Sequence, residues 1–595
     1  MRAFSAFLLA IAGATLIQAS LAQNASSLRK TARKTVVSSA SPDVIFFNAV
    51  IYTGEGFSND KPQTAQAMAI GGGKVLAVGT TNEVTKLAGP HTRLRDLDSA
   101  NTSTFIFPGF NDAHVHLGGA GRTRLNIDLT GVQSLDEMLA KIAGFAKGQP
   151  DGHWLTGGNW DHTLWTGKVL PTRQDLDRVT GDHPAFLDRI DGHIAIANTA
   201  ALKAAGITGA TKPPQGGAID LDAAGEPTGI LRESAQGLVE KVIPPPTPEE
   251  RRRGLELAIA DALAHGVTSV QDFSKWDDFL AYEELEREGK LNLRIAEWIP
   301  FQAPLEELER MRAHHDANDP MLHTTMLKGF MDGSLGSRTA AMKEPYADDP
   351  GNTGLPQYTQ AQLDAMTIER ARAGFQIGFH AIGDEGVAMG LEALSKAAEN
   401  RPPGCKAQTG AARTARVCPG ARNRIEHAQV VDPNEIQLFA KLGIVASMQP
   451  CHLLTDMNWA EARLGPERAA YSYAWKAFLD ARVPLAFGTD YPVESISPFR
   501  GLYAAVTRMN EAGTRSYFPE QKITRGQALF AYTQGSAYAE FAEKHKGKLE
   551  PGYDADFILV DRDLYKTAAP ALLQTKVLEA FVAGSEVYSG TMRIQ

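Results

Sequence analysis

Residues 105–119 have the sequence FIFPGFNDAHVHLGG, in which an apolar run turns at Pro108-Gly109 and continues into a short strand. Successive side chains of a strand alternate between its two faces, so His114 and His116 point to the same side. Two imidazoles on one side are what a metal site requires. The HxH pattern alone is more often a pair of packed or solvated histidines, so the rest of the chain has to discriminate.

The middle of the chain alternates strands with helices. Besides the HxH strand, apolar runs predict strands at residues 267–272, 293–298, 325–330, 376–380, 424–427, 444–448 and 485–490. Eight βα units predict an α/β fold, a (β/α)8 TIM barrel over residues 108–544, whose active site lies at the carboxyl ends of the strands. Residues 117 to about 246 are too many for one βα loop, which predicts an inserted subdomain that covers the substrate.

Both ends of the folded chain show short strands separated by tight turns. Residues 43–107 contain several four-residue apolar runs and the turn Gly71-Gly72-Gly73, and residues 545–595 repeat this pattern. We therefore expect the two ends to form the two parts of one small β-sandwich domain, with the barrel inserted between them.

The N-terminus has the pattern of a secretory signal peptide over residues 1–22. Arg2 supplies a positive charge, residues 4–17 are mainly apolar, and Ser20-Leu21-Ala22 gives the small-x-small cleavage pattern. The apolar run is short for a membrane span, which needs about 20 residues, so we expect no span after cleavage. An uncleaved anchor is the alternative. Residues 23–42 are expected to be a flexible leader, and the protein is expected to be secreted or periplasmic.

Charge and cysteine content restrict the function further. The net charge is −9 and there is no basic stripe, which argues against nucleic acid as a partner. The chain has three cysteines. An exported chain meets oxidising conditions, so a Cys405–Cys418 disulfide is plausible but left open, and Cys451 is then expected to be a buried free thiol.

Polar side chains occur at the ends of the predicted strands. A strand-end histidine, a single lysine and an aspartate after Gly-Thr each have an ordinary structural explanation. Together at the mouth of one barrel they indicate a metal-dependent hydrolase. The candidate metal-binding residues are His114, His116, Lys328, His380, His427 and Asp490.

The chain resembles the amidohydrolase superfamily, specifically the amidohydrolase-3 branch that includes N-substituted formamide deformylase-like enzymes. The resemblance covers nearly the whole mature chain, and its motifs are specific for the superfamily but not for the substrate. They are residues 108–116, Asp191-Gly192-His193 with Asn198, Lys328 with residues 332–334, residues 380–384, residues 426–428, residues 449–452, residues 488–492 and residues 552–556.

The resemblance implies a role for each of these residues. Lys328 would be carboxylated and would bridge two metal ions. His114, His116 and Asp490 would hold the more buried ion, and His380 and His427 the more exposed one. The alternative is a single ion with Lys328 unmodified. Imidazoles and carboxylates suit Zn²⁺, with Fe, Mn or Co as substitutes.

The expected activity is hydrolysis of a C–N bond of the amide or N-acyl type in a small molecule. A metal-activated water would attack, and Asp490 would act first as general base and then as general acid. His193 and, with a weaker claim, His452 would bind the substrate. The alternatives are a single-metal deaminase or cyclic amidase, against which Lys328 weighs, and an inactive metal-binding protein. Related barrel hydrolases often form homodimers, but no residue here indicates one.

Overall fold

The computed structural model describes residues 41–98, 104–189, 194–214, 217–233, 235–400 and 422–590. The expected signal peptide, nearly all of the leader, His193 and the Cys405–Cys418 pair lie outside the described residues. Those expectations stay predictions. Among the described residues, no helix combines the length and the apolar character that a bilayer span needs.

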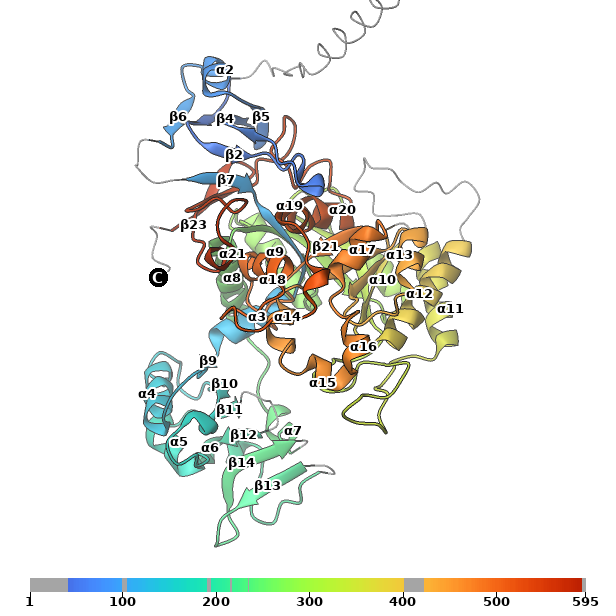
Figure 1. Cartoon of the computed structure of the whole chain (residues 1–595). Helices are drawn as coiled ribbons and strands as arrows, with labels where there is room; N and C mark the ends of the chain where they lie inside the picture. The colour runs from blue at the N-terminus through green and yellow to red at the C-terminus, as the bar shows by residue number, and fades with distance from the viewer. Residues whose placement is uncertain are drawn as a thin grey trace, which may run out of the picture.

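The centre of the molecule is the expected (β/α)8 barrel (Figure 1). Within the described residues its sheet has eight strands, and each pairs in parallel with the next one along the chain. The strands are β8 (Phe110–Val115), β15 (Val267–Asp272), β16 (Arg294–Pro300), β17 (Leu322–Phe330), β18 (Gln376–Ala381), β19 (Arg424–His427), β20 (Val445–Met448) and β21 (Leu485–Phe487). The predicted fold class is confirmed.

Helices cover the outside of the barrel, which is why its strands are nearly continuous buried runs. The longest of them, α8 (Pro248–Ala264), begins with a capping box between Thr247 and Glu250 and with proline at its first position. The other main helices are α9 (Trp276–Arg287), α10 (Leu305–His314), α11 (Gln360–Arg372), α12 (Asp384–Glu399), α13 (Ile436–Leu442), α17 (Trp475–Asp480) and α18 (Pro498–Thr507).

The barrel closes between its first and last strands. The amide of Asp490 donates to the carbonyl of His114 at 2.8 Å, and the amide of His116 donates to the carbonyl of Tyr491 at 2.7 Å. These two bonds lie just beyond the end of β21, at the carboxyl end of the barrel. We call this junction the seam.

The two chain ends form one small β domain, as expected (Figure 1). One sheet has the order β24-β23-β22-β7-β2-β3, so strands from both ends pair within it, and the other has the order β5-β4-β1-β6. Phe46, Phe557 and Phe581 pack between the sheets, the last two stacked at 4.4 Å. The strands are β1 (Val44–Phe47), β2 (Val50–Tyr52), β3 (Thr64–Ala65), β4 (Ala67–Gly71), β5 (Lys74–Gly79), β6 (Arg93–Asp96), β7 (Phe105–Pro108), β22 (Phe557–Val560), β23 (Val577–Val582) and β24 (Ser585–Ser589).

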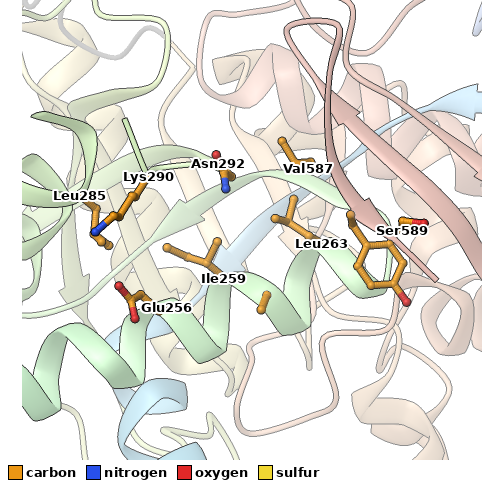
Figure 2. Close-up of a pocket in the computed structure, with 10 residues that line it drawn as sticks. Glu256, Ile259, Leu263, Leu285, Lys290, Asn292, Val587 and Ser589 are labelled. Atoms are coloured by element: carbon orange, nitrogen blue, oxygen red, sulfur yellow. The ribbon is translucent and has the colours of Figure 1, made fainter. Parts of the chain in front are cut away.

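The β domain is attached to the amino-terminal end of the barrel. Arg294 at the start of β16 donates to both carboxylate oxygens of Asp556, at 2.6 and 2.9 Å, and both side chains are buried. A pocket of about 360 Å³ lies outside the barrel where α8 meets β24, lined in part by Ile259, Leu263 and Val587 (Figure 2). The pocket is therefore separate from the strand ends that carry the candidate site.

The segment after α3 (Leu117–Leu125) forms a unit with its own sheet, which stands apart from the barrel in Figure 1. Its sheet has the order β13-β14-β12-β11-β10-β9, and Trp160 and Trp165 are buried in its core. Its strands and main helices are β9 (Ile127–Asp128), β10 (Gly157–Trp160), β11 (Phe186–Arg189), β12 (Ile194–Ala197), β13 (Gly217–Leu221), β14 (Pro227–Glu233), α4 (Leu135–Ala146), α5 (Arg173–Thr180) and α6 (Thr199–Ala204).

Candidate active site

The six predicted metal-binding residues lie together at the carboxyl end of the barrel. His114 is the second-last residue of β8, and His116 directly follows that strand. The remaining four come from strands on the opposite side of the barrel and from the segment after β21. They are Lys328 of β17, His380 of β18, His427 of β19 and Asp490.

His114, His116 and Asp490 form a compact group whose ligand atoms lie within 4.8 Å of one another. Asp490 Oδ1 lies 3.1 Å from His116 Nε2 and 3.6 Å from His114 Nε2. The Nδ1 atoms face away, at 2.8 Å from Glu426 Oε2 for His114 and at 2.8 Å from the Phe273 carbonyl for His116. Acceptors at Nδ1 fix the tautomer in which Nε2 carries the lone pair, as they do for metal-bound histidines.

Lys328 is fully buried beside this group. Its Nζ lies 3.0 Å from His114 Nε2 and within 5.2 Å of the ring centroids of Trp298 and Phe330. Burial lowers the pKa of Lys328 to about 8, although the charges of Glu426 and Asp490 oppose the shift. About a tenth of the side chain is therefore the neutral amine at pH 7, far more than for an exposed lysine.

His380 and His427 stand next to each other, with ring centroids 4.5 Å apart. Burial first, and then the Lys328 charge, lowers the pKa of His380 to about 4. Its Nε2 donates to the Gly333 carbonyl at 2.9 Å, which leaves Nδ1 as the acceptor nitrogen of the neutral ring. The buried Nδ1 of His427 has no hydrogen-bond partner within the described part of the chain.

His452, at the start of α14 (His452–Asp456), contacts the same aspartate. Its Nε2 lies 3.2 Å from Asp490 Oδ2, and His427, His452 and Asp490 form a second group of ligand atoms within 4.8 Å. Burial opposes protonation, but the Asp490 carboxylate raises the pKa of His452 to about 9. Although burial raises it, the neighbouring imidazoles of His116 and His452 hold the pKa of Asp490 well below its usual range.

The backbone at two of these positions is in the left-handed region, with φ of 61° at Asp490 and 71° at His427. Asp112 stabilises the first of these turns. Its carboxylate accepts from the Thr489 hydroxyl at 2.6 Å and from the amides of Thr489 and His114 at 2.9 and 3.1 Å. Strained backbone that surrounding contacts over-determine is typical of functional sites.

The comparisons with known proteins agree with this geometry. The model of the amidohydrolase family matches residues 104–588. The chain belongs to the amidohydrolase family. It is 32% identical over 558 residues to Protein LONG AFTER FAR-RED 3 of Arabidopsis thaliana, covering 92% of this chain and 91% of that protein. It is 26% identical over 565 residues to N-substituted formamide deformylase of Arthrobacter pascens, covering 92% and 99% of the two chains.

A solved structure extends the comparison to the fold. The crystal structure of an uncharacterized metal-dependent hydrolase from Pyrococcus furiosus matches with a TM-score of 0.70 at 30% identity, covering 88% of this chain and 100% of that one. The predicted membership of the amidohydrolase-3 branch is confirmed. This amidohydrolase is a metal-dependent hydrolase that acts on a small molecule.

The amidohydrolase site also contains residues to which the sequence analysis gave no role. Glu426 accepts from His114, and the buried Arg424 contacts both of its carboxylate oxygens, at 2.7 and 3.1 Å. The Asp332 carboxylate accepts from the amides of Ala341, Ile382 and Gly383 behind His380. Both residues lie in motifs of the resemblance, and a charged residue inside a predicted barrel strand, for Glu426, or just after one, for Asp332, was the signal that could have identified them.

Two further sequence predictions have different outcomes. The structure does not describe His193, so its substrate-binding role stays a prediction. Cys451 is a buried free thiol, as expected, and its Sγ lies 3.4 Å from the Thr489 carbonyl. Burial raises its pKa well above the usual range, which makes it a poor nucleophile.

Proposed function

We propose that this amidohydrolase hydrolyses a C–N bond of the amide or N-acyl type, with Asp490 as the group that moves the proton. The observation that supports this most directly is that Asp490 Oδ1 lies 3.1 Å from His116 Nε2 and 3.6 Å from His114 Nε2. The Arthrobacter relative is named an N-substituted formamide deformylase, and a formamide contains an N-acyl bond. Small N-formyl and N-acyl amines are therefore the first substrates to test.

The side chains present fit a divalent metal ion. The Nε2 lone pairs of His114 and His116 converge on a carboxylate oxygen, an arrangement that is repulsive without a cation or a proton between them. Burial lowers the pKa of His114 and of His427 well below the usual range, so both are in the neutral form that binds metals. This donor set favours Zn²⁺, with Fe, Mn or Co as alternatives. A bound ion would lower the pKa of a water and polarise the substrate carbonyl.

Asp490 supplies the proton transfer. As an ionised carboxylate it takes up the proton that the attacking water loses, and it returns that proton to the nitrogen of the departing amine. One C–O bond forms and one C–N bond breaks, which gives a carboxylic acid and an amine. His452 donates to Oδ2 at 3.2 Å and so keeps Oδ1 directed toward the histidine pair.

We further propose that Lys328 carries a carbamate. The neutral Nζ adds to carbon dioxide and loses a proton, and the resulting carboxylate would bridge two ions, the second held by His380 and His427. The alternative is one ion and an unmodified Lys328, whose Nζ keeps the 3.0 Å contact to His114 Nε2. That arrangement would favour a deaminase or a cyclic amidase.

Metal content separates these alternatives. The metal at the carboxyl end of the barrel is the amount that the mature protein, purified without chelators, holds above a His114→Ala/His380→Ala variant. Elemental analysis should give a difference of about two equivalents per chain, and the Lys328→Ala variant should lose at least one. A difference of about one equivalent that Lys328→Ala leaves unchanged would instead support the single-ion site and direct the screen to heterocyclic amines. No metal, together with no activity on any amide after metal addition, would overturn the proposed function.

We also propose that residues 1–22 direct export, which makes the substrate a periplasmic or extracellular one. The apolar run followed by Ser20-Leu21-Ala22 supports this. N-terminal sequencing of the protein from its native host should begin at Gln23. A chain that begins at its initiator residue and stays with the membrane would favour the uncleaved anchor.

A further inference from the structure

A second cluster of metal-binding side chains lies at the other end of the barrel. Glu286 is near the end of α9, His315 directly follows α10, and Asp319 lies in the loop that leads to β17. One ligand atom from each lies within 4.8 Å of the others. Helix ends that precede strands lie at the amino-terminal face of a barrel, opposite the catalytic face. This cluster is therefore independent of the site described above.

The two ring nitrogens of His315 have different surroundings. Nδ1 lies 2.7 Å from Glu283 Oε1, one helical turn before Glu286. Nε2 is buried and has no hydrogen-bond partner within the described residues, yet it faces Glu286 Oε2 at 3.4 Å and Asp319 Oδ2 at 3.9 Å. A carboxylate at Nδ1 and two carboxylates around Nε2 is the carboxylate–histidine–metal pattern of metalloproteins.

The backbone holds the third carboxylate in place. Asp319 Oδ1 accepts from the amides of Met321 and Leu322 at 2.7 and 3.1 Å, which fixes the orientation of Oδ2 toward the imidazole. The exposed fractions of His315, Glu286 and Asp319 are 15%, 25% and 28%, which leaves a path for an ion from solvent.

We propose that Glu286, His315 and Asp319 bind a divalent transition-metal ion of the Zn²⁺ class, with Glu283 as the outer partner of His315. One imidazole nitrogen and two carboxylate oxygens, with water in the remaining position, suit Zn²⁺. The ion joins α9 to the connection between α10 and β17, so its role is to stabilise the amino-terminal end of the barrel. The competing explanation is a protonated His315 that forms ion pairs with the same carboxylates.

Metal content and thermal stability of the full chain distinguish the two explanations. Wild type and the double variant Glu286→Gln/Asp319→Asn are dialysed against the same buffered free Zn²⁺ and analysed for zinc. Glu284→Gln is the matched control, because Glu284 is exposed on the same helix. Wild type and Glu284→Gln should hold about one equivalent of zinc more than the double variant. Added zinc should therefore raise the Tm of these two proteins by more than it raises the Tm of the double variant.

Equal zinc content in all three proteins would overturn the proposal. If the double variant also melts lower than wild type without any metal, the ion-pair explanation gains direct support. Should the double variant fail to fold, His315→Gln provides the same comparison with a neutral side chain of similar reach. The comparison does not use catalysis, so its failure is distinguishable from failure of the proposed hydrolase activity.

Discussion

Glu426 offers a direct test of how the barrel positions its proposed metal ligands. Its Oε2 accepts from His114 Nδ1 at 2.8 Å, while Arg424 contacts both carboxylate oxygens, and all three side chains are buried. The carboxylate thereby fixes the tautomer of His114 and makes Nε2 a stronger donor to a metal. Glu426→Gln keeps the size of the side chain but removes its charge.

The expected loss of metal affinity in this variant can be worked out in two ways. Replacing an outer partner of a metal-bound histidine costs about 10- to 100-fold in metal affinity, which corresponds to about 1.4–2.7 kcal/mol. Exchanging a hydrogen bond to a charged group, worth about 1.5–3 kcal/mol, for one to a neutral group, worth about 0.5–1.5 kcal/mol, costs about 1–1.5 kcal/mol, which reaches the lower end of the first range. We therefore expect Glu426→Gln to bind the more buried metal ion about 10- to 100-fold more weakly.

Competition against a chromophoric chelator measures this affinity. The matched control is Glu540→Gln, because Glu540 is also buried, accepts from Asn111 at 2.6 Å and pairs with Lys546, but lies away from the metal ligands. The control should lose stability without losing metal affinity. A Glu426→Gln variant that binds metal within twofold of wild type would refute the argument, because His114 would then need no charged partner.

Three further outcomes follow from the geometry. Asp490→Asn should reduce kcat by about 10²- to 10⁴-fold while metal content falls much less; equal losses in steady-state kinetics and elemental analysis would make Asp490 only a ligand. The pKa of His380 is lowered from 6.5 to about 4, so the unfolded chain binds that proton first, and the metal-free protein should lose stability as pH falls from about 6.5 to about 4. Urea unfolding across this range should show a flatter profile for His380→Asn, and parallel profiles would contradict the assignment. Arg294→Met leaves Asp556 buried without its partner and should lower the free energy of unfolding by about 3–5 kcal/mol in urea; an unchanged midpoint would mean that this ion pair contributes nothing.

The barrel could be predicted because parallel strands covered by helices leave continuous apolar runs in the sequence. The limits of the strands were harder to predict, because long-range contacts determine them. Residues 485–490 were expected as one strand, but β21 ends at Phe487. Beyond it, Asp112 binds Thr489, 377 residues away in the chain, and Asp490 adopts a left-handed conformation. The periodicity of apolar residues cannot indicate a contact between residues so far apart in the chain.

The residues of the candidate site also fall into those that the sequence could identify and those that it could not. His114, His380 and His427 were identifiable because each histidine ends a recognisable strand. Glu426 lies next to one of them, yet its partner is His114, 312 residues earlier, and only the closed barrel brings the two together. The contact of His452 with Asp490 joins two loops that follow different strands.

The seam gives a physical reason why the proposed ligands of the more buried ion would come from the first and last strands. His114 lies in β8, His116 directly follows it, and Asp490 follows β21, so an ion bound by all three would join the two edges that close the barrel. Backbone hydrogen bonds of 2.8 and 2.7 Å connect the same two segments, and the Asp112 carboxylate accepts from the neighbouring Thr489. Metal binding and barrel closure would then be thermodynamically coupled, so a closed seam would raise the metal affinity and a bound ion would stabilise the closed seam. A substitution that weakens the seam without changing a proposed ligand should therefore also lower the metal affinity.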